Sequence, residues 1–173
     1  MKKTKTGFDG LYVLQGENFR DKRGFLREIF KKELVKENMV FSVVSSSKRN
    51  VIRGLHFQEK NSQAKFVTVI KGEILDVAVD LRKKSKTFGK HYKIILSENN
   101  SKFLFIPKGF AHGFLAKKKE NIVLYSCSNY RDPKEERSIA WNDSRLSINW
   151  GIKKPIVSKK DAKAFSFNEF IKE

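Results

Sequence analysis

The sequence lacks the features that form disulfides, span membranes or direct secretion. Its 173 residues include one cysteine, Cys127, so an intrachain disulfide is impossible. No apolar stretch approaches the ~18 residues that a membrane span needs. The N-terminal residues MKKTKTGFDG are basic but lack the apolar core of a signal peptide. We therefore expect a protein of the reducing cytoplasm with no membrane partner.

Repeats, low-complexity tracts and linkers rich in proline, glycine or serine are also missing from the sequence. A chain of this length is about the size of one domain, and it can bury enough surface to fold without a disulfide or a metal. The sequence therefore predicts a single domain over residues 1–173.

Acidic residues are few compared with basic ones: 37 Lys and Arg against 19 Asp and Glu give a net charge of +18. Such a field suits an anionic partner, which can be a nucleic acid, an anionic membrane surface or a phosphorylated small molecule. The basic residues are dispersed in pairs and triplets, whereas nucleic-acid-binding proteins concentrate them on one helix or face. We expect a lysine-rich solvated surface and no nucleic-acid partner.

Short runs of β-strand character, separated by turn residues, fill most of the chain. They cover residues 40–46, 51–58, 65–70, 73–81, 91–96, 103–106, 113–116 and 122–128. Helical patterns are confined to residues 31–38 and 161–171. In residues 74–81, one predicted face is apolar and the other carries Asp76 and Asp80. This pattern predicts an all-β sandwich or barrel with a partly polar interior and a ligand pocket.

The three histidines are the first candidates for chemistry. His56 lies in Arg53-Gly54-Leu55-His56, where a bulge at Gly54 would bring Arg53 and His56 to one face of a strand. His112 restarts a strand after the turn that contains Pro107 and Gly109. His91, flanked by lysines, is expected to be an exposed strand residue.

The spacing Pro107-x-Gly109-x-x-His112 resembles the second motif of the cupin superfamily. Metal-binding cupins also carry a His-x-His pair followed by a glutamate, and this chain has no His-x-His. Because a metal site needs three or four well-placed ligands, we expect no metal.

Several segments, taken together and in order, resemble one family much more closely. They are residues 21–28, Arg53–Gln58, Gly72-Glu73 with Asp76–Asp80, Ser85–Gly89, Pro107–Phe114, Trp141-Asn142-Asp143 and Ser158–Asp161. This chain is similar to the dTDP-4-dehydrorhamnose 3,5-epimerases of nucleotide-sugar metabolism from about Phe8 to about Asp161. The resemblance implies a cupin-type double-stranded β-helix, a jelly-roll barrel with short flanking helices. It also implies a cofactor-free isomerase, and a homodimer whose N-terminal strands cross to the partner.

The catalytic residues follow from the same resemblance. Epimerisation at a carbon beside a ketone needs a base, a cation at the enolate oxygen and an acid on the other ring face. The family pattern implies His56 as the base, Lys65 as the cation and Tyr125 as the acid. It gives Asp161 the better claim to orient His56, while Asp76 is a candidate partner for His112.

The resemblance also implies contacts with a nucleotide-diphosphate sugar substrate. The implied substrate-binding residues are Phe19, Arg23, Glu28, Ser45, Arg53, His112, Arg131, Glu136 and Lys160. Two departures from the family fall among them. Val43-Val44-Ser45 stands where relatives carry a polar Gln-x-Asn, so that Ser45 is the one polar replacement. Arg131 stands where many relatives have a second tyrosine, and arginine can both stack on a base and pair with phosphate.

Other functions fit the same residues. A single-carbon epimerase and a 3,4-ketoisomerase also begin with proton abstraction beside a ketone. A non-catalytic basic β-barrel that binds nucleic acid or glycan is the alternative from a different class. The Arg53, His56, Lys65 and Tyr125 set favours an enzyme over that binding protein.

Overall fold

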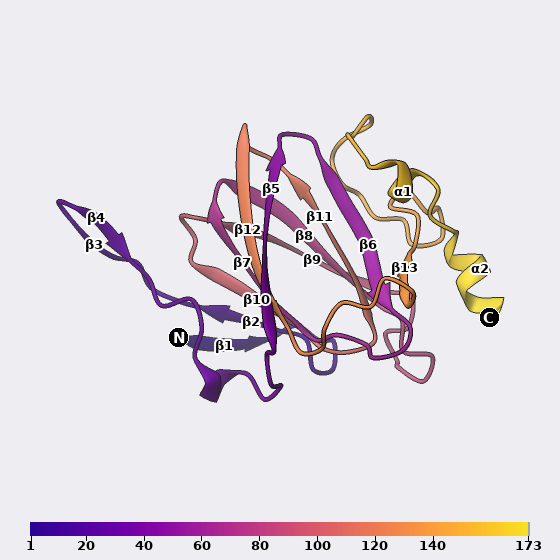
Figure 1. Cartoon of the computed structure of the whole chain (residues 1–173), viewed down its shortest axis with the longest axis horizontal. Coiled ribbons are helices and arrows are strands. Elements are labelled where there is room, and N and C mark those ends of the chain that lie inside the picture. Colours follow the sequence, from indigo (N-terminus) through magenta and orange to yellow (C-terminus); the bar gives the residue numbers. More distant parts are fainter. Residues whose placement is uncertain (173) are drawn as a thin grey trace.

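The computed structural model describes residues 1–172, and strands dominate it (Figure 1). The strands are β1 (Lys2–Lys5), β2 (Tyr12–Gln15), β3 (Phe19–Asp21), β4 (Gly24–Leu26), β5 (Phe41–Lys48), β6 (Ile52–Gln58), β7 (Lys65–Lys71), β8 (Glu73–Asp80), β9 (His91–Ser97), β10 (Lys102–Ile106), β11 (Phe110–Ala116), β12 (Glu120–Cys127) and β13 (Glu136–Ser138). The helical segments are the 3-10 turn η1 (Lys32–Leu34) and the helices α1 (Lys159–Ala162) and α2 (Phe167–Lys172). The all-β prediction is confirmed.

Two antiparallel sheets face each other. One has six strands in the order β1-β2-β10-β7-β12-β5, and the other has five in the order β13-β6-β11-β8-β9. Within residues 1–172 these sheets stay separate, so the jelly roll is a sandwich and not a closed barrel. Strands β3 and β4 form a hairpin that projects away from both sheets (Figure 1).

The main apolar core lies between the two sheets, because its buried members come from both. Val67 and Val69 of the six-stranded sheet pack with Ile74, Ala78 and Phe114 of the five-stranded sheet. A second core covers the outer face of the five-stranded sheet, where Val77 and Val79 meet residues of the C-terminal segment. The predicted alternation along β8 is therefore confirmed, and the face that carries Asp76 points into the sandwich. Full burial of each large apolar side chain contributes about 1.5–3 kcal/mol.

A bulge interrupts the pairing of β6 with β11. His56 is opposite His112 and Arg53 is opposite Phe114. Between these two pairs, β6 therefore contains one more residue than β11. Gly54 lies at this point with a φ of 115°, and an added Cβ would come within 2.6 Å of the His112 carbonyl oxygen and of the Gly113 Cα. The predicted bulge is present and depends on a glycine.

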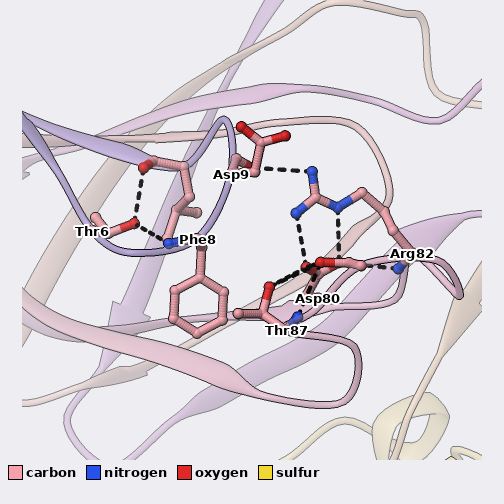
Figure 2. A network of polar contacts seen from close by, with 8 residues as sticks. Thr6, Phe8, Asp9, Asp80, Arg82 and Thr87 are labelled. Carbon is pink, nitrogen blue, oxygen red and sulfur yellow. Dashed lines mark hydrogen bonds and ion pairs between the residues drawn. The ribbon is translucent and has the colours of Figure 1, made fainter.

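A buried carboxylate joins two loops at one end of the sandwich (Figure 2). Asp80 accepts hydrogen bonds from the Arg82 guanidinium, from Ser85 Oγ and from Thr87 Oγ1. Arg82 Nη1 also donates to the Asp9 carbonyl oxygen at 3.0 Å. The β1–β2 loop is thereby fixed to the loop that follows β8.

The predicted strand segments coincide with β5 to β12 apart from a few residues at their ends. The two helix predictions were largely wrong. Residues 31–38 contain only the turn η1, and residues 161–171 hold two short helices instead of one. The chain is extended between α1 and α2 because Phe165 bridges to Ile139 and accepts a hydrogen bond from the Ala140 amide.

Candidate active site

A cleft of about 330 Å³ opens beside strand β6. Strand β6 contributes Arg53 and His56, and helix α1 contributes Lys160 and Asp161. The remaining polar lining includes Glu136 of β13 and Arg131 of the loop before it. The structure therefore brings together side chains that are up to about a hundred residues apart in sequence.

His56 and Asp161 form a close pair at the base of this cleft. His56 Nε2 lies 2.6 Å from Asp161 Oδ1, and the aspartate is 4% exposed. Asp161 sits in the first turn of α1, where its amide donates to the capping Ser158 Oγ at 3.0 Å. Burial raises the pKa of Asp161, but the interaction with His56, together with the hydrogen bonds of Gly54 and Ser158, outweighs it and lowers the pKa. An ionised Asp161 holds the Nε2 proton of His56 and leaves Nδ1 to act on a ligand.

A second histidine–aspartate pair lies next to the first. His112 is opposite His56 across β6 and β11, and its Nε2 lies 2.9 Å from Asp76 Oδ2. Both members of the pair are buried. The Tyr125 ring meets the His112 ring edge-on, with centroids 6.5 Å apart. His112 therefore links the pair in the cleft to a side chain of the opposite sheet.

Lys65 and Tyr125 come from the six-stranded sheet and face the histidines. Lys65 is opposite Cys127 on β12, and Tyr125 lies one inward-facing position before that cysteine. Within residues 1–172, Lys65 Nζ has no hydrogen bond or ion pair. Burial lowers the pKa of Lys65, while Cys127, Glu136 and Asp76 oppose that change. Burial raises the pKa of Tyr125, which keeps its hydroxyl protonated at neutral pH.

Cationic groups line the rest of the cleft. Arg53 is held by Ser47, whose Oγ accepts from Nε at 2.9 Å, and by the Ser46 carbonyl oxygen. Glu136 Oε2 accepts from both Arg131 Nη2 and Lys160 Nζ at 2.7 Å. Burial raises the pKa of Glu136, but these two cations outweigh it and hold the pKa at about 2. The cleft thus contains three cationic side chains within reach of an anionic ligand.

Comparison with known proteins identifies the family of this chain. A model of the dTDP-4-dehydrorhamnose 3,5-epimerases matches residues 5–169. The dTDP-4-dehydrorhamnose 3,5-epimerase of Methanothermobacter thermautotrophicus is 43% identical over 91% of this chain and 89% of its own length. That of Salmonella typhimurium is 42% identical over 92% of each chain. The chain belongs to the dTDP-4-dehydrorhamnose 3,5-epimerase family.

A solved structure extends the likeness to three dimensions. The dTDP-6-deoxy-D-glucose-3,5-epimerase of Legionella pneumophila, determined in complex with dTDP-4-keto-L-rhamnose, superposes with a TM-score of 0.92. It is 38% identical, and the match covers 96% of this chain and 93% of that one. The predicted family, the cupin-type fold and the enzyme class, an isomerase, are all confirmed.

Three residues that the family resemblance assigned to the substrate do not lie in this cleft. Phe19 and Arg23 belong to the β3–β4 hairpin and Glu28 follows it, far from β6 and α1 (Figure 1). Arg23 pairs with Asp21 at 2.6 Å, and Glu28 pairs with Lys31 at 2.8 Å. Within one chain, these residues and His56 are in separate regions.

The remaining candidates lie near the cleft or outside it. Ser45 is on the inward-facing side of β5, and its Oγ is buried without a hydrogen-bond partner within residues 1–172. His91, expected to be exposed, is half-buried at the start of β9, and burial lowers its pKa. In the described part of the chain, no cluster of three His, Cys, Asp or Glu side chains could hold a metal, and no helix is long and apolar enough to cross a membrane.

The sequence also contained one residue outside the cleft whose contacts with a cleft loop were not foreseen. Gln58 ends the Arg53–Gln58 motif, two positions beyond His56 and therefore on the same face of β6. It is 5% exposed and uses both ends of its amide for hydrogen bonds. The period-two spacing from His56 was the available signal.

Proposed function

We propose that this chain epimerises a nucleotide-linked 4-keto-6-deoxy sugar at carbon 3, carbon 5 or both. The single observation that carries the proposal is the His56–Asp161 pair at 2.6 Å, in a cleft that also holds Arg53 and Lys160. A base with one nitrogen available, next to cations suited to phosphate, fits proton abstraction from a nucleotide sugar. Family membership supports the same chemistry.

In the first step, His56 Nδ1 takes the proton from the carbon beside the ketone. The electron pair of the C–H bond moves into the ring and the carbonyl oxygen becomes an enolate. Asp161 stabilises the imidazolium that forms on His56, as the aspartate does in other catalytic histidine–aspartate pairs. The Lys65 ammonium, which has no anionic partner within hydrogen-bond distance among residues 1–172, stabilises the enolate oxygen.

In the second step, Tyr125 returns a proton to the same carbon from the other face. Tyr125 is on the six-stranded sheet and His56 on the five-stranded sheet, which supports action from opposite sides. The O–H bond breaks, the new C–H bond forms and the enolate becomes a ketone again. Transfer of the proton on His56 back to the tyrosinate, directly or through solvent, restores the enzyme.

The diphosphate of the substrate binds to Arg53, Lys160 and Arg131. Lys160 and Arg131 are held on Glu136 before the ligand arrives, so their orientation is set in advance. Guanidinium groups match pairs of phosphate oxygens. The Legionella relative, solved with dTDP-4-keto-L-rhamnose, supports a dTDP-linked sugar as the substrate.

A homodimer would complete the site. The hairpin that carries Phe19 and Arg23 cannot reach its own cleft, and it exposes Phe19, Phe25 and Leu26 by 55%, 45% and 66%. Insertion of this hairpin beside the cleft of a second copy would cover these apolar side chains and add the missing contacts.

Solvent exchange tests the proposed function. We expect incubation with dTDP-4-keto-6-deoxyglucose in deuterium oxide to place deuterium at the carbons beside the ketone, as followed by NMR. Deuterium at two positions supports double epimerisation, and deuterium at one position supports the single-carbon epimerase or the ketoisomerase. No exchange, with nucleotide binding intact, would refute the enzyme and favour the binding protein.

A further inference from the structure

Gln58 lies between the loop that carries Arg131 and the loop that follows β6, outside the set of residues that touch the reacting sugar in the proposed function. We infer that Gln58 is a positioning residue: it holds the loop that carries Arg131 and thereby sets the affinity for the nucleotide. The inference rests on the proposed function for the identity of the ligand and for the contact of Arg131 with its diphosphate.

The side-chain amide of Gln58 joins two loops. Its Nε2 donates to the Asn61 carbonyl oxygen at 3.0 Å and to the Tyr130 carbonyl oxygen at 3.3 Å. Its Oε1 accepts from the Asp132 amide at 2.9 Å. Both donors and the acceptor of this buried amide are therefore used.

The contacts fall on both sides of Arg131. Tyr130 precedes it and Asp132 follows it, so that Gln58 holds the backbone at the two peptides next to this residue. Gln58 is also opposite Glu136 in the pairing of β6 with β13, and Glu136 is the carboxylate that receives the Arg131 guanidinium. The side-chain amide of Gln58 therefore positions the loop that carries Arg131, and its backbone lies in the strand that pairs with Glu136.

The loop borders open space on its other side as well. A second cavity of about 400 Å³ is lined by Asn61, Asn129 and residues 130–133. Arg131 lines this cavity and the catalytic cleft, which makes it the residue shared by both. A displacement of the loop would therefore move the Arg131 guanidinium relative to the catalytic cleft, where we place the diphosphate, and to the second cavity.

Loss of the amide should weaken binding without slowing the chemistry. The Tyr130 carbonyl and the Asp132 amide would lose their partner, while the Asn61 carbonyl would keep its bond from Asn129. The loop would then sample other conformations, so Arg131 would have to be ordered when the nucleotide binds. His56 is oriented by Asp161 of α1, which does not touch the Arg131 loop through any hydrogen bond given by the structure. The effect should appear in KM and in the dissociation constant, and kcat should be spared.

A thermodynamic cycle on nucleotide binding tests this role. We would titrate dTDP calorimetrically into the full-length wild type, Gln58→Leu, Arg131→Ala and the double variant. We expect each single variant to lose about tenfold in affinity, and the double variant to be no weaker than Arg131→Ala within about twofold. We also expect kcat of Gln58→Leu to remain within about twofold of the wild type.

Asp143→Leu is the matched control. Asp143 also joins two backbone segments by three hydrogen bonds, to the amides of Arg145, Leu146 and Phe167, but it lies outside the cleft. This variant should lose thermal stability and keep its affinity for dTDP. If Gln58→Leu does not fold, Gln58→Met replaces it with a side chain of similar length.

Additive losses in the double variant, an unchanged affinity in Gln58→Leu, or a loss of kcat that matches the loss of affinity would each overturn the inference. A wild-type protein that binds dTDP but exchanges no carbon-bound hydrogen would refute the proposed enzyme instead. In that case the binding cycle would still decide whether Gln58 positions Arg131.

Discussion

The cleft and the β3–β4 hairpin hold their charged side chains in different ways. In the cleft, His56 is bonded to Asp161, and Glu136 to Lys160, across long separations in sequence. On the hairpin, Arg23 pairs with Asp21 two residues away, and the bond is exposed to solvent. Exposed local pairs contribute little to stability, whereas a buried pair fixes the geometry of its members. The charged side chains of the cleft are therefore fixed by distant residues of the same chain, whereas those at the tip of the hairpin contact only their neighbours in sequence.

The root of the hairpin differs again from its tip. Arg27 Nη2 donates to the Val69 carbonyl oxygen at 2.8 Å, and Nη1 donates to the Glu98 carbonyl oxygen at 3.2 Å. The same guanidinium lies 5.9 Å from the centroid of the buried Phe103 ring. These contacts anchor the root of the hairpin to the body of the molecule, while Phe19 and the Arg23–Asp21 pair at its tip are exposed to solvent.

Replacement of His56 by alanine should have the largest effect, because it removes the base from the organised region. We expect turnover to fall by about 10²–10⁴ while dTDP binds nearly as well as to the wild type. Deuterium exchange measures the first quantity and calorimetry the second. Near wild-type activity in a folded His56→Ala protein would rule out the mechanism.

Tyr125→Phe should separate the two halves of the reaction in the same region. The ring and its packing against His112 are kept, and the donor is lost. We expect exchange of carbon-bound hydrogen to continue and epimer formation to fall by about 10². NMR in deuterium oxide follows both at once. Full epimer yield at the normal rate would remove Tyr125 from the mechanism.

Arg23→Ala tests the region that is not organised within one chain. We expect KM to rise about tenfold with a small change in kcat, because Arg23 would act only in binding. A mixture of the Arg23→Ala and His56→Ala proteins, refolded together, should recover activity at low substrate. Half of the dimers would be mixed, with one complete site each, so that about a quarter of the sites would work. No recovery would contradict the crossed dimer and make the hairpin's exposure unrelated to substrate.

The sequence predicted the inner strands well, because β6, β8 and β12 combine alternation with β-branched residues and clear turns. It did not predict β1, whose Lys2–Lys5 segment has no apolar face to reveal it. The single C-terminal helix was wrong because Phe165 is drawn into a bridge with Ile139, a contact between distant residues that local patterns do not contain.

The site was predictable where a local rule applied. The bulge at Gly54 follows from the glycine and the spacing of Arg53 and His56 on one strand. The family pattern led to Asp161 as the partner of His56, which the structure places at 2.6 Å. The separation of Arg23 from the cleft was expected only through the family resemblance, which implies N-terminal strands that cross to a partner. The motifs themselves give the order of residues and not their distance in the fold.

Asp80→Asn should have the smallest effect on activity and so serves as the control for both regions. Burial raises the pKa of Asp80, but hydrogen bonds from Arg82, Ser85 and Thr87 outweigh it and lower the pKa from 3.8 to about 2. Because the folded-state pKa is the lower one, the stabilisation is complete well above pH 3.8 and is lost as the pH falls through about 2. It corresponds to about 2 kcal/mol.

Denaturant unfolding of the wild type and Asp80→Asn between pH 7 and pH 2 measures this contribution. We expect the variant to be less stable at pH 7 and the difference to shrink as the pH approaches 2, while kcat and KM at pH 7 stay within about twofold of the wild type. Other carboxylates titrate in both proteins and cancel in the difference. If the difference in unfolding free energy between the two proteins did not depend on pH, the negative charge of Asp80 would not contribute to its stabilising effect. A large loss of activity would show that the hydrogen bonds of Figure 2 affect the cleft. The activity losses of the cleft variants could then no longer be separated from losses of stability.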